Sequence, residues 1–222
     1  MKKKFILIVF LICNLIIGYS QNFDSITDSR DGQKYKIVQI GDQWWMAQNL
    51  NFYTSVGSSY YKNDSVRFAG KYGRLYNWTT ANCACPDGWH LSTHDDWKKL
   101  ETFLGIPSDV YQAIEQPHTE HPYIGTNQGG FLKDTILWET PNTGATNSTG
   151  FSAIPAGLRH ADNAPDPWRN NFYDLGIVAH FWASEYSSDN AYVRILSNDK
   201  SAIHIIDSNK SAYRSVRCVK DK

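Results

Sequence analysis

The chain has 222 residues, of which 41% are hydrophobic and 20% charged, with 22 basic and 22 acidic side chains. This length and apolar content suffice for one substantial core, and no Pro- or Ser-rich linker divides the sequence, so we expect one domain after any leader. The balanced charge gives no support to nucleic-acid or anionic-membrane binding, which requires a basic patch.

The first 20 residues have the pattern of a secretory signal peptide. Three lysines precede an apolar run from Phe5 to Ile17, and Gly18-Tyr19-Ser20 provides the small residues expected at a cleavage site. The run is shorter than a membrane span of about 20 residues. Cys13 lies inside it after bulky residues, so we expect cleavage near Ser20 and not lipid attachment.

Cleavage changes the charge and the cysteine count. The leader carries three of the 22 basic residues, none of the 22 acidic ones and one of the four cysteines, so the mature domain (residues 21–222) has a net charge of −3 and three cysteines. We therefore expect a secreted or cell-surface protein with no membrane span after cleavage and no nucleic-acid partner.

A β-hairpin is the first predicted element of the mature chain. Apolar and polar residues alternate from Tyr35 to Ile40, Gly41-Asp42 is a turn signal, and a second run follows from Gln43 to Ala47. The stretch from Tyr53 to Gly70 is rich in Gly, Ser, Tyr and Asn, which predicts a surface loop.

Two short helices are expected next. Leu75 to Ala81 fits a short helix, and a stronger signal begins at Ser92-Thr93, where a hydroxyl cap precedes acidic residues and then apolar residues at helical spacing as far as Leu104. Gly105-Ile106-Pro107 ends this second helix.

The second half of the chain divides into a long loop region and a run of strands. From Tyr111 to Asn147 the composition is that of loops, with a helical turn around Val110 to Glu115, and so long a connection is usually functional or poorly ordered. Beyond it, four runs rich in Val, Ile and aromatic residues predict a C-terminal antiparallel meander. They are His180–Glu185, Ala191–Leu196, Ala202–Ile206 and Tyr213–Lys220.

Three cysteines in the mature chain allow at most one internal disulfide. Cys83 and Cys85 are too close to pair with each other without strain, so Cys218 pairs with one of them, and the spacing alone leaves the choice open. Three buried free thiols are the alternative.

The loop from Ala161 to Asp174 carries the candidate binding residues. Its carboxylates offer the oxygen ligands that calcium prefers, although a polar turn-rich loop explains them too. We expect no cofactor other than this candidate calcium ion. An aromatic side chain among amides and charges in a loop suits recognition of a glycan or a peptide. The metal candidates are Asp162, Asp166 and Asp174, and the ligand candidates are Trp168, Arg169, Asn170 and Asn171.

Other candidate sites are weaker. His90 with His94, and His118 with His121, lack the four ligands of a structural zinc site. No Gly-x-Ser-x-Gly elbow and no phosphate-binding glycine loop is present, and we name no catalytic residue. Tryptophans in regular elements belong in the core, and we expect this for Trp44, Trp78, Trp89, Trp97 and Trp182.

Five segments carry a recognisable pattern in chain order: DGQKYKIVQIGDQWWMAQNL (31–50), YGRLYNW (72–78), CPDGWHLST (85–93), GFSAIPAG (150–157) and SVRCV (215–219). Together they resemble the Fibrobacter succinogenes major paralogous domain family, exported bacterial proteins of unassigned function. The resemblance covers nearly the whole mature chain. It implies an α+β, C-type-lectin-like fold related to the formylglycine-generating enzymes.

The resemblance also bears on the cysteines and on chemistry. Cys85 and Cys218 occupy family-like positions, which implies that these two form the disulfide, whereas Cys83 is an addition. The family ordinarily has proline where this chain has Ser92, and a serine cap can start the helix equally well. The related enzymes use paired thiols from the C-terminal part, and Cys218 is the one cysteine after Cys85.

These features favour a secreted bacterial, non-enzymatic binding module that recognises a glycan or a surface protein through the loops Tyr111–Asn147 and Ala161–Asp174. Two alternatives stay open. One is a structural or assembly component of the cell surface, and the other is an enzyme of unknown type.

Overall fold

The computed structural model describes residues 21–114 and 122–222, and over these the chain forms an α+β fold built on two β-sheets. The signal peptide predicted at residues 1–20, together with His118 and His121, lies outside the described residues. Among the helices within the described ranges, none has the length and apolar character needed to cross a membrane.

The first sheet has five strands and contains the predicted hairpin. Its order is β1 (Phe23–Thr27), β2 (Lys34–Ile40), β3 (Gln43–Met46), β14 (Cys218–Lys220) and β6 (Trp89–Leu91). The hairpin of β2 and β3 is confirmed, with Gly41 in the left-handed region at φ 63° in its turn. Since β14 lies between β3 and β6, this sheet joins the N-terminal hairpin to the end of the chain.

The second sheet has nine strands. Its order is β4 (Ser58–Ser59), β5 (Leu75–Asn77), β13 (Tyr213–Arg214), β8 (Ala156–Arg159), β10 (Val178–Glu185), β11 (Asn190–Ser197), β12 (Ile203–Asn209) and β7 (Tyr123–Ile124), and β9 (Phe172–Leu175) pairs with β8. β8 and β10 are parallel, and the other pairs are antiparallel.

The predicted meander is confirmed for its first three strands. β10 pairs antiparallel with β11, and β11 pairs antiparallel with β12. The prediction of Tyr213–Lys220 as the fourth strand is wrong, because this run divides into β13 of the second sheet and β14 of the first.

The residues between β13 and β14 explain this division. The N–H of Ser215 donates to the His180 carbonyl at 3.1 Å, and its own carbonyl accepts from the Trp182 N–H at 3.1 Å. Two residues later the Arg217 carbonyl accepts from the Ser92 N–H at 3.1 Å. The segment crosses from one sheet to the other with its backbone groups satisfied on both sides, which an apolar and polar pattern does not reveal.

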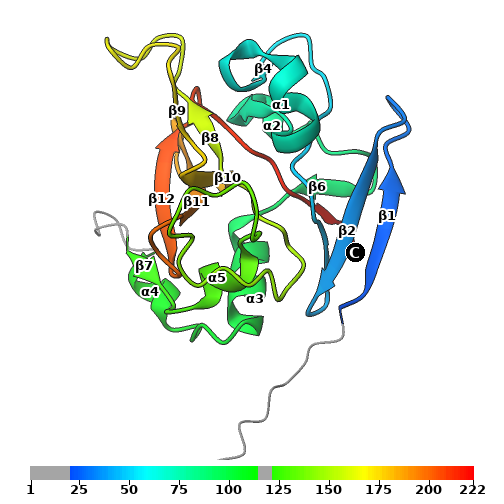
Figure 1. Ribbon diagram of the computed structural model, residues 1–222, viewed down its shortest axis with the longest axis vertical. Coiled ribbons are helices and arrows are strands. Elements are labelled where there is room, and N and C mark those ends of the chain that lie inside the picture. Colours follow the sequence, from blue (N-terminus) through cyan, green and yellow to red (C-terminus); the bar gives the residue numbers. More distant parts are fainter. Residues whose placement is uncertain (1–20, 115–121) are drawn as a thin grey trace, which may run out of the picture.

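The helices are short. They are α1 (Ser65–Tyr72), α2 (Trp78–Ala81), α3 (His94–Phe103), α4 (Val110–Ile114) and α5 (Gln128–Leu132), with a 3₁₀ turn, η1 (Tyr61–Asn63). Figure 1 shows α1 and α2 at one end of the molecule and α3, α4 and α5 at the other. α4 confirms the helical turn predicted around Val110, whereas β7 and α5 give the predicted loop region more regular structure than its composition indicated.

α3 confirms the strongest helix prediction, but the expectation that Ser92 caps it is wrong, because Thr93 is the cap and the buried Ser92 hydroxyl accepts from Trp97 Nε1 at 3.0 Å. The Thr93 hydroxyl accepts from the Asp96 N–H at 3.0 Å, and the Asp96 carboxylate accepts from the Thr93 N–H at 2.9 Å, which is a capping box. The helix predicted at Leu75–Ala81 is confirmed only in part, because its first three residues form β5 and α2 begins at Trp78.

The loop predicted at Tyr53–Gly70 is wrong in its second half, which contains α1. Asp64 caps this helix by accepting from the Arg67 N–H at 3.0 Å. The ring of Phe68 packs against Tyr61 at 5.5 Å and against Tyr72 at 6.0 Å between centroids. Aromatic residues that resemble loop composition are thus the packing surface of the helix.

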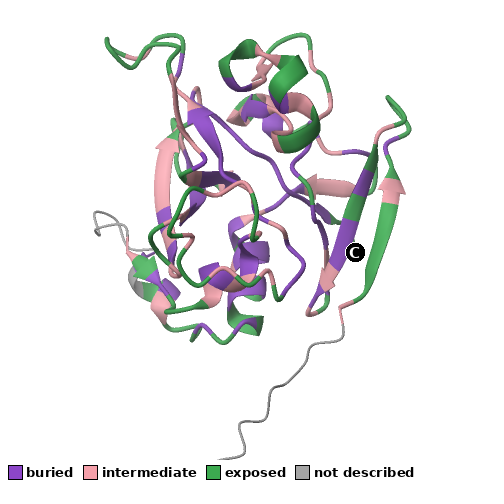
Figure 2. Cartoon of the chain, in the orientation of Figure 1, coloured by how far each residue is buried: buried purple, intermediate pink, exposed green. Residues whose placement is uncertain are grey.

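Buried aromatic rings form the centre of the main core, which is the purple interior in Figure 2. Trp45, Trp97, Phe151 and Phe181 contact one another with centroid separations from 5.1 to 5.8 Å. Among the tryptophans expected in the core, Trp97 and Trp182 are fully buried. Trp44, Trp78 and Trp89 are partly buried and pack against a second buried cluster.

Candidate functional site

The loop that carries the predicted ligand residues joins the two strands of a hairpin. β8 and β9 pair antiparallel, with Arg159 opposite Phe172 and Leu158 opposite Tyr173. The predicted loop Ala161–Asp174 therefore ends inside a strand. Figure 1 shows this connection (yellow) projecting at the end of the molecule that holds α1, and most of it is exposed in Figure 2.

Hydrogen bonds within the loop hold its shape. The Arg159 guanidinium donates to the Asp162 carboxylate and to Asn170 Oδ1, the latter at 2.6 Å. The Asn170 N–H donates to the Ala161 carbonyl at 3.3 Å, and the Arg169 Nε donates to the Ala164 carbonyl at 3.2 Å. The two ends of the loop are thereby tied together, so its tip has a defined conformation.

Three rings meet on this hairpin and form what we call the aromatic cluster: His160, Trp168 and Tyr173. Their centroids are 5.3 Å apart for His160 and Trp168, 5.4 Å for His160 and Tyr173, and 5.3 Å for Trp168 and Tyr173. Trp168 is 47% exposed. Trp168 stands out in the sequence by its polar neighbours, whereas His160 and Tyr173 carry no such signal, because the hairpin brings them together from either side of the loop.

The other predicted ligand residues are partly engaged in the loop itself. Asn170 binds Arg159, and Asn171 Nδ2 donates to the Pro167 carbonyl. Arg169 keeps a side chain that is 54% exposed, with Nε 4.0 Å from an Asp166 oxygen. Among the predicted ligand residues, Arg169 therefore carries an exposed charge, and the two asparagines mainly hold the loop.

A group of buried and half-buried polar side chains lies close to the aromatic cluster. His180 Nε2 lies 3.2 Å from Asp174 Oδ2, and this hydrogen bond lowers the pKa of Asp174. Burial lowers the pKa of His180 to about 4 and that of Arg214 to about 10. Burial, and then the charge of Arg214, lowers the pKa of His160. At neutral pH both histidines are thus uncharged, and Asp174 and Arg214 carry the charges.

The predicted calcium ligands each have a different partner. Asp162 pairs with Arg159, Asp166 with Arg169, and Asp174 with His180. Within residues 21–114 and 122–222, no group of three or more His, Cys, Asp or Glu side chains is placed to hold a metal ion. The calcium site stays a prediction from composition, and the geometry of the described residues does not add to it.

The calcium hypothesis has a measurable consequence. A cation bound only to the folded state would raise the melting temperature, and a chelator would reverse the increase. Differential scanning calorimetry of the mature protein with calcium and with chelator measures this directly. The variant Asp162→Asn with Asp166→Asn should abolish the increase, and identical melting curves for the unaltered protein would contradict the hypothesis.

The two histidines near α3 do not form a joint site. His90 lies between two carboxylates, with Nδ1 2.6 Å from Asp221 and Nε2 2.9 Å from Asp96, and the hydrogen bond to Asp96 raises its pKa. His94 instead stacks on Tyr192 at 4.0 Å, and burial lowers its pKa to about 3. His90 therefore tethers the C-terminal segment, whereas His94 is part of the interior.

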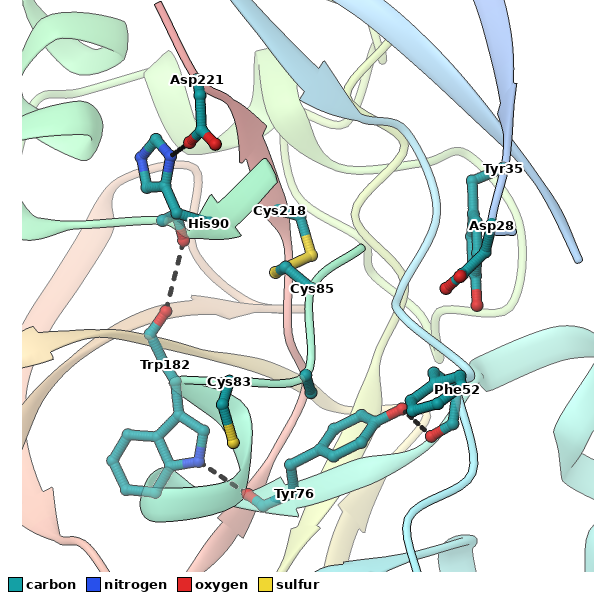
Figure 3. Close-up of a disulfide and its surroundings, with 12 residues drawn as sticks. Asp28, Tyr35, Phe52, Tyr76, Cys83, Cys85, His90, Trp182, Cys218 and Asp221 are labelled. Atoms are coloured by element: carbon teal, nitrogen blue, oxygen red, sulfur yellow. Dashed lines mark hydrogen bonds and ion pairs between the residues drawn. A yellow bond between two sulfur atoms is a disulfide. The ribbon is translucent and has the colours of Figure 1, made fainter. Parts of the chain in front are cut away.

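A disulfide joins Cys85 to Cys218, as the family resemblance implied (Figure 3). Cys218 lies on β14 opposite Leu91 of β6, so the bond fixes the last strand next to the segment before α3. Cys83 is an exposed free cysteine whose Sγ lies 3.4 Å from the Thr80 carbonyl, directed away from the disulfide in Figure 3.

Comparison with known proteins gives one match. The model of the Fibrobacter succinogenes major domain matches residues 38–220, which include most of the hairpin, both disulfide cysteines and the aromatic cluster. No curated protein and no solved structure matches the chain. Because the match covers most of the sequence, the chain belongs to the Fibrobacter succinogenes major domain family.

Proposed function

We propose that the protein is an exported, non-enzymatic binding module that recognises a carbohydrate through the aromatic cluster of His160, Trp168 and Tyr173. The observation that carries the proposal is the placement of Trp168, which is 47% exposed on a projecting loop and supported by two further rings. An exposed aromatic face of this kind can pack against the apolar face of a sugar ring.

The surroundings of the cluster favour a carbohydrate over a protein partner. Arg169 and the amides of Asn170 and Asn171 lie next to Trp168 in the chain, and every residue from 165 to 171 is exposed. Stable protein interfaces usually need a larger area with an apolar centre. A small aromatic surface with polar groups around it suits a ligand that has both apolar faces and hydroxyl groups.

The arrangement of elements supports a C-type-lectin-like fold as part of this proposal. An N-terminal hairpin pairs with the last strand, short helices follow it, and an antiparallel meander of β10, β11 and β12 precedes the end. The leader pattern and the disulfide between Cys85 and Cys218 support export, because disulfides persist mainly in oxidising compartments.

Glycan-array binding of the mature protein, followed by calorimetric titration, tests the proposed function. Trp168→Ala removes the most exposed ring of the cluster and should weaken binding of the array-selected glycan roughly tenfold, since an aromatic contact contributes about 1 to 1.5 kcal/mol. Tyr53→Ala is the matched control, because Tyr53 is 64% exposed and lies outside the cluster.

The outcome separates the proposed function from its rivals. Binding that is lost in Trp168→Ala and kept in Tyr53→Ala supports carbohydrate recognition by the cluster. Absence of any bound glycan, with recovery of surface proteins instead, would contradict it in favour of a structural role. Equal affinity of Trp168→Ala and the unaltered protein would show that the glycan binds outside the aromatic cluster.

A further inference from the structure

A groove lies away from the aromatic cluster, across one face of the first sheet. It consists of two cavities of about 540 and 570 Å³ that share Lys36, Ala47 and Ser152 in their linings. We call it the lysine groove, because Lys34, Lys36 and Lys71 line the first of the two cavities. Two adjoining cavities give the groove the length that a chain-like ligand needs.

Strand geometry explains why two of the lysines face the groove. Alternate residues of β2 share one face of the sheet, which places Lys34 and Lys36 on the same side as Val38 and Ile40. Val38 and Ile40 are buried in the main core, whereas Lys34 and Lys36 are exposed. The groove therefore lies where this face extends beyond the core, and Lys71 reaches it from the last turn of α1.

The charges of these lysines are not neutralised by an ion pair within the part of the chain that the structure describes. None of the three forms an ion pair with a described residue. Among the described residues, Asp134 is the one acidic residue lining the first cavity and Asp24 is the one lining the second. The mature chain as a whole is negative, so an excess of positive charge around one cavity runs against the average charge of the surface.

An amide donor lies beside the lysines. Gln48 lines the same cavity, and its Oε1 accepts from the Lys36 N–H at 2.8 Å. This bond orients the side-chain amide and leaves its Nε2 without a partner among the described residues. Such a group can donate to hydroxyl or carboxylate oxygens of a ligand.

The far end of the groove has an aromatic surface. Phe23 lines the second cavity and is 60% exposed. Its ring lies against Gly150, where an added Cβ would approach the ring to 2.6 Å, and Gly150 has φ +69°. The absence of a side chain at Gly150 therefore leaves room for the ring at this place, and the ring is largely exposed to water.

We propose that the lysine groove binds an acidic polysaccharide, with carboxylates of the sugar chain on Lys34, Lys36 and Lys71 and a sugar ring on Phe23. An acidic peptide would share the charge. The peptide is less favoured, because both cavities are lined by side-chain amides and Lys36 lies in both of them. The large aliphatic residues that line the first cavity, Ile136, Leu137 and Ile154, are exposed or half-buried and so offer no buried pocket for an anchoring side chain. The inference does not depend on the aromatic cluster, whose proposed ligand is separate.

Binding of fluorescent polygalacturonate, measured by anisotropy at low salt, is the direct test. Neutral dextran of equal length and poly-glutamate are the comparison probes. We expect the mature protein to bind polygalacturonate in preference to both, with affinity that falls as salt is added, because exposed charges are screened. The variant Lys34→Gln with Lys36→Gln and Lys71→Gln should lose at least about tenfold in affinity.

Two further variants control for net charge and for folding. Lys62→Gln with Lys99→Gln and Lys220→Gln removes the same charge at exposed positions that do not line the groove, and it should keep the affinity within about twofold. Gly70→Leu tests the space itself, because Gly70 lines the groove, has no positive φ, and an added Cβ there meets nothing within 4 Å. Gly70→Leu should lose binding while Gly70→Ala keeps it.

The results divide cleanly. Selective loss in the groove variants, with retention in the distant lysine variant and in Trp168→Ala, supports the inference. Equal losses in the two lysine variants, or no binding of polygalacturonate at low salt, would overturn it. Preference for poly-glutamate would overturn the polysaccharide in favour of a peptide. Loss in Trp168→Ala alone would place the acidic ligand on the aromatic cluster and overturn the groove.

Discussion

The variant Cys218→Ser is expected to lower the free energy of unfolding by about 2 to 5 kcal/mol, the usual cost of removing a native disulfide from a small exported domain. The disulfide with Cys85 spans 133 residues of sequence, so its loss releases a long segment in the unfolded chain. Cys218 is fully buried, and its strand β14 lies between β3 and β6. Loss of the disulfide therefore also removes the covalent link that holds this last strand in the first sheet.

Urea denaturation of the variant and of the unaltered protein measures this difference. Cys83→Ser is the matched control, since Cys83 is exposed and outside the bond, and it should change stability by less than about 0.5 kcal/mol. Peptide mapping without reduction should find Cys85 joined to Cys218. A Cys83 to Cys218 peptide would overturn the pairing, and three alkylatable thiols in protein from an oxidising compartment would overturn the bond.

Removal of the buried arginine by Arg194→Met should destabilise the fold by about 3 to 5 kcal/mol. Arg194 Nε donates to Glu101 Oε1 at 2.7 Å, and Tyr111 donates its hydroxyl to Glu101 Oε2 at 2.8 Å. Both members of the ion pair have fully buried side chains. The variant leaves the Glu101 carboxylate without its cation in the interior, where an unpaired charge is costly.

A double variant distinguishes this electrostatic cause from lost packing. Glu101→Leu combined with Arg194→Met removes both charges, and it should be less destabilised than Arg194→Met alone because no unpaired charge remains. Thermal and urea unfolding of the single and double variants give the coupling energy. Purely additive losses would show that packing and not charge pairing dominates at this position.

Local signals in the sequence located the elements whose chemistry is contained in a few neighbouring residues. The turn at Gly41 and the hydroxyl cap at Thr93 specify the hairpin and α3, and both are confirmed. The disulfide followed from family-like positions and not from spacing, since the spacing left Cys83 and Cys85 equivalent.

Elements that depend on distant partners were harder to predict. α1 has a cap at Asp64, but the composition around it is typical of a loop. The contact of Phe68 with Tyr61, which stabilises the helix, is visible only in the structure. The segment after Tyr213 reads as one strand, and only the positions of β10 and Ser92 show that it changes sheets.

The same limit applies to the two candidate binding surfaces. Trp168 is identifiable from its polar neighbours, but His160 and Tyr173 join it only because β8 and β9 pair. Alternation places Lys34 and Lys36 on one face. The position of Lys71 beside them could not be predicted, because it lies on α1, and the composition of that segment indicates a loop.

The central claim, that the aromatic cluster binds a carbohydrate, is tested most directly by an NMR titration of the mature protein with the glycan selected on an array. The indole N–H signal of Trp168 and the signals of His160 and Tyr173 should shift together and saturate at one dissociation constant. A bound glycan that leaves these three residues unshifted and perturbs signals elsewhere would contradict the claim.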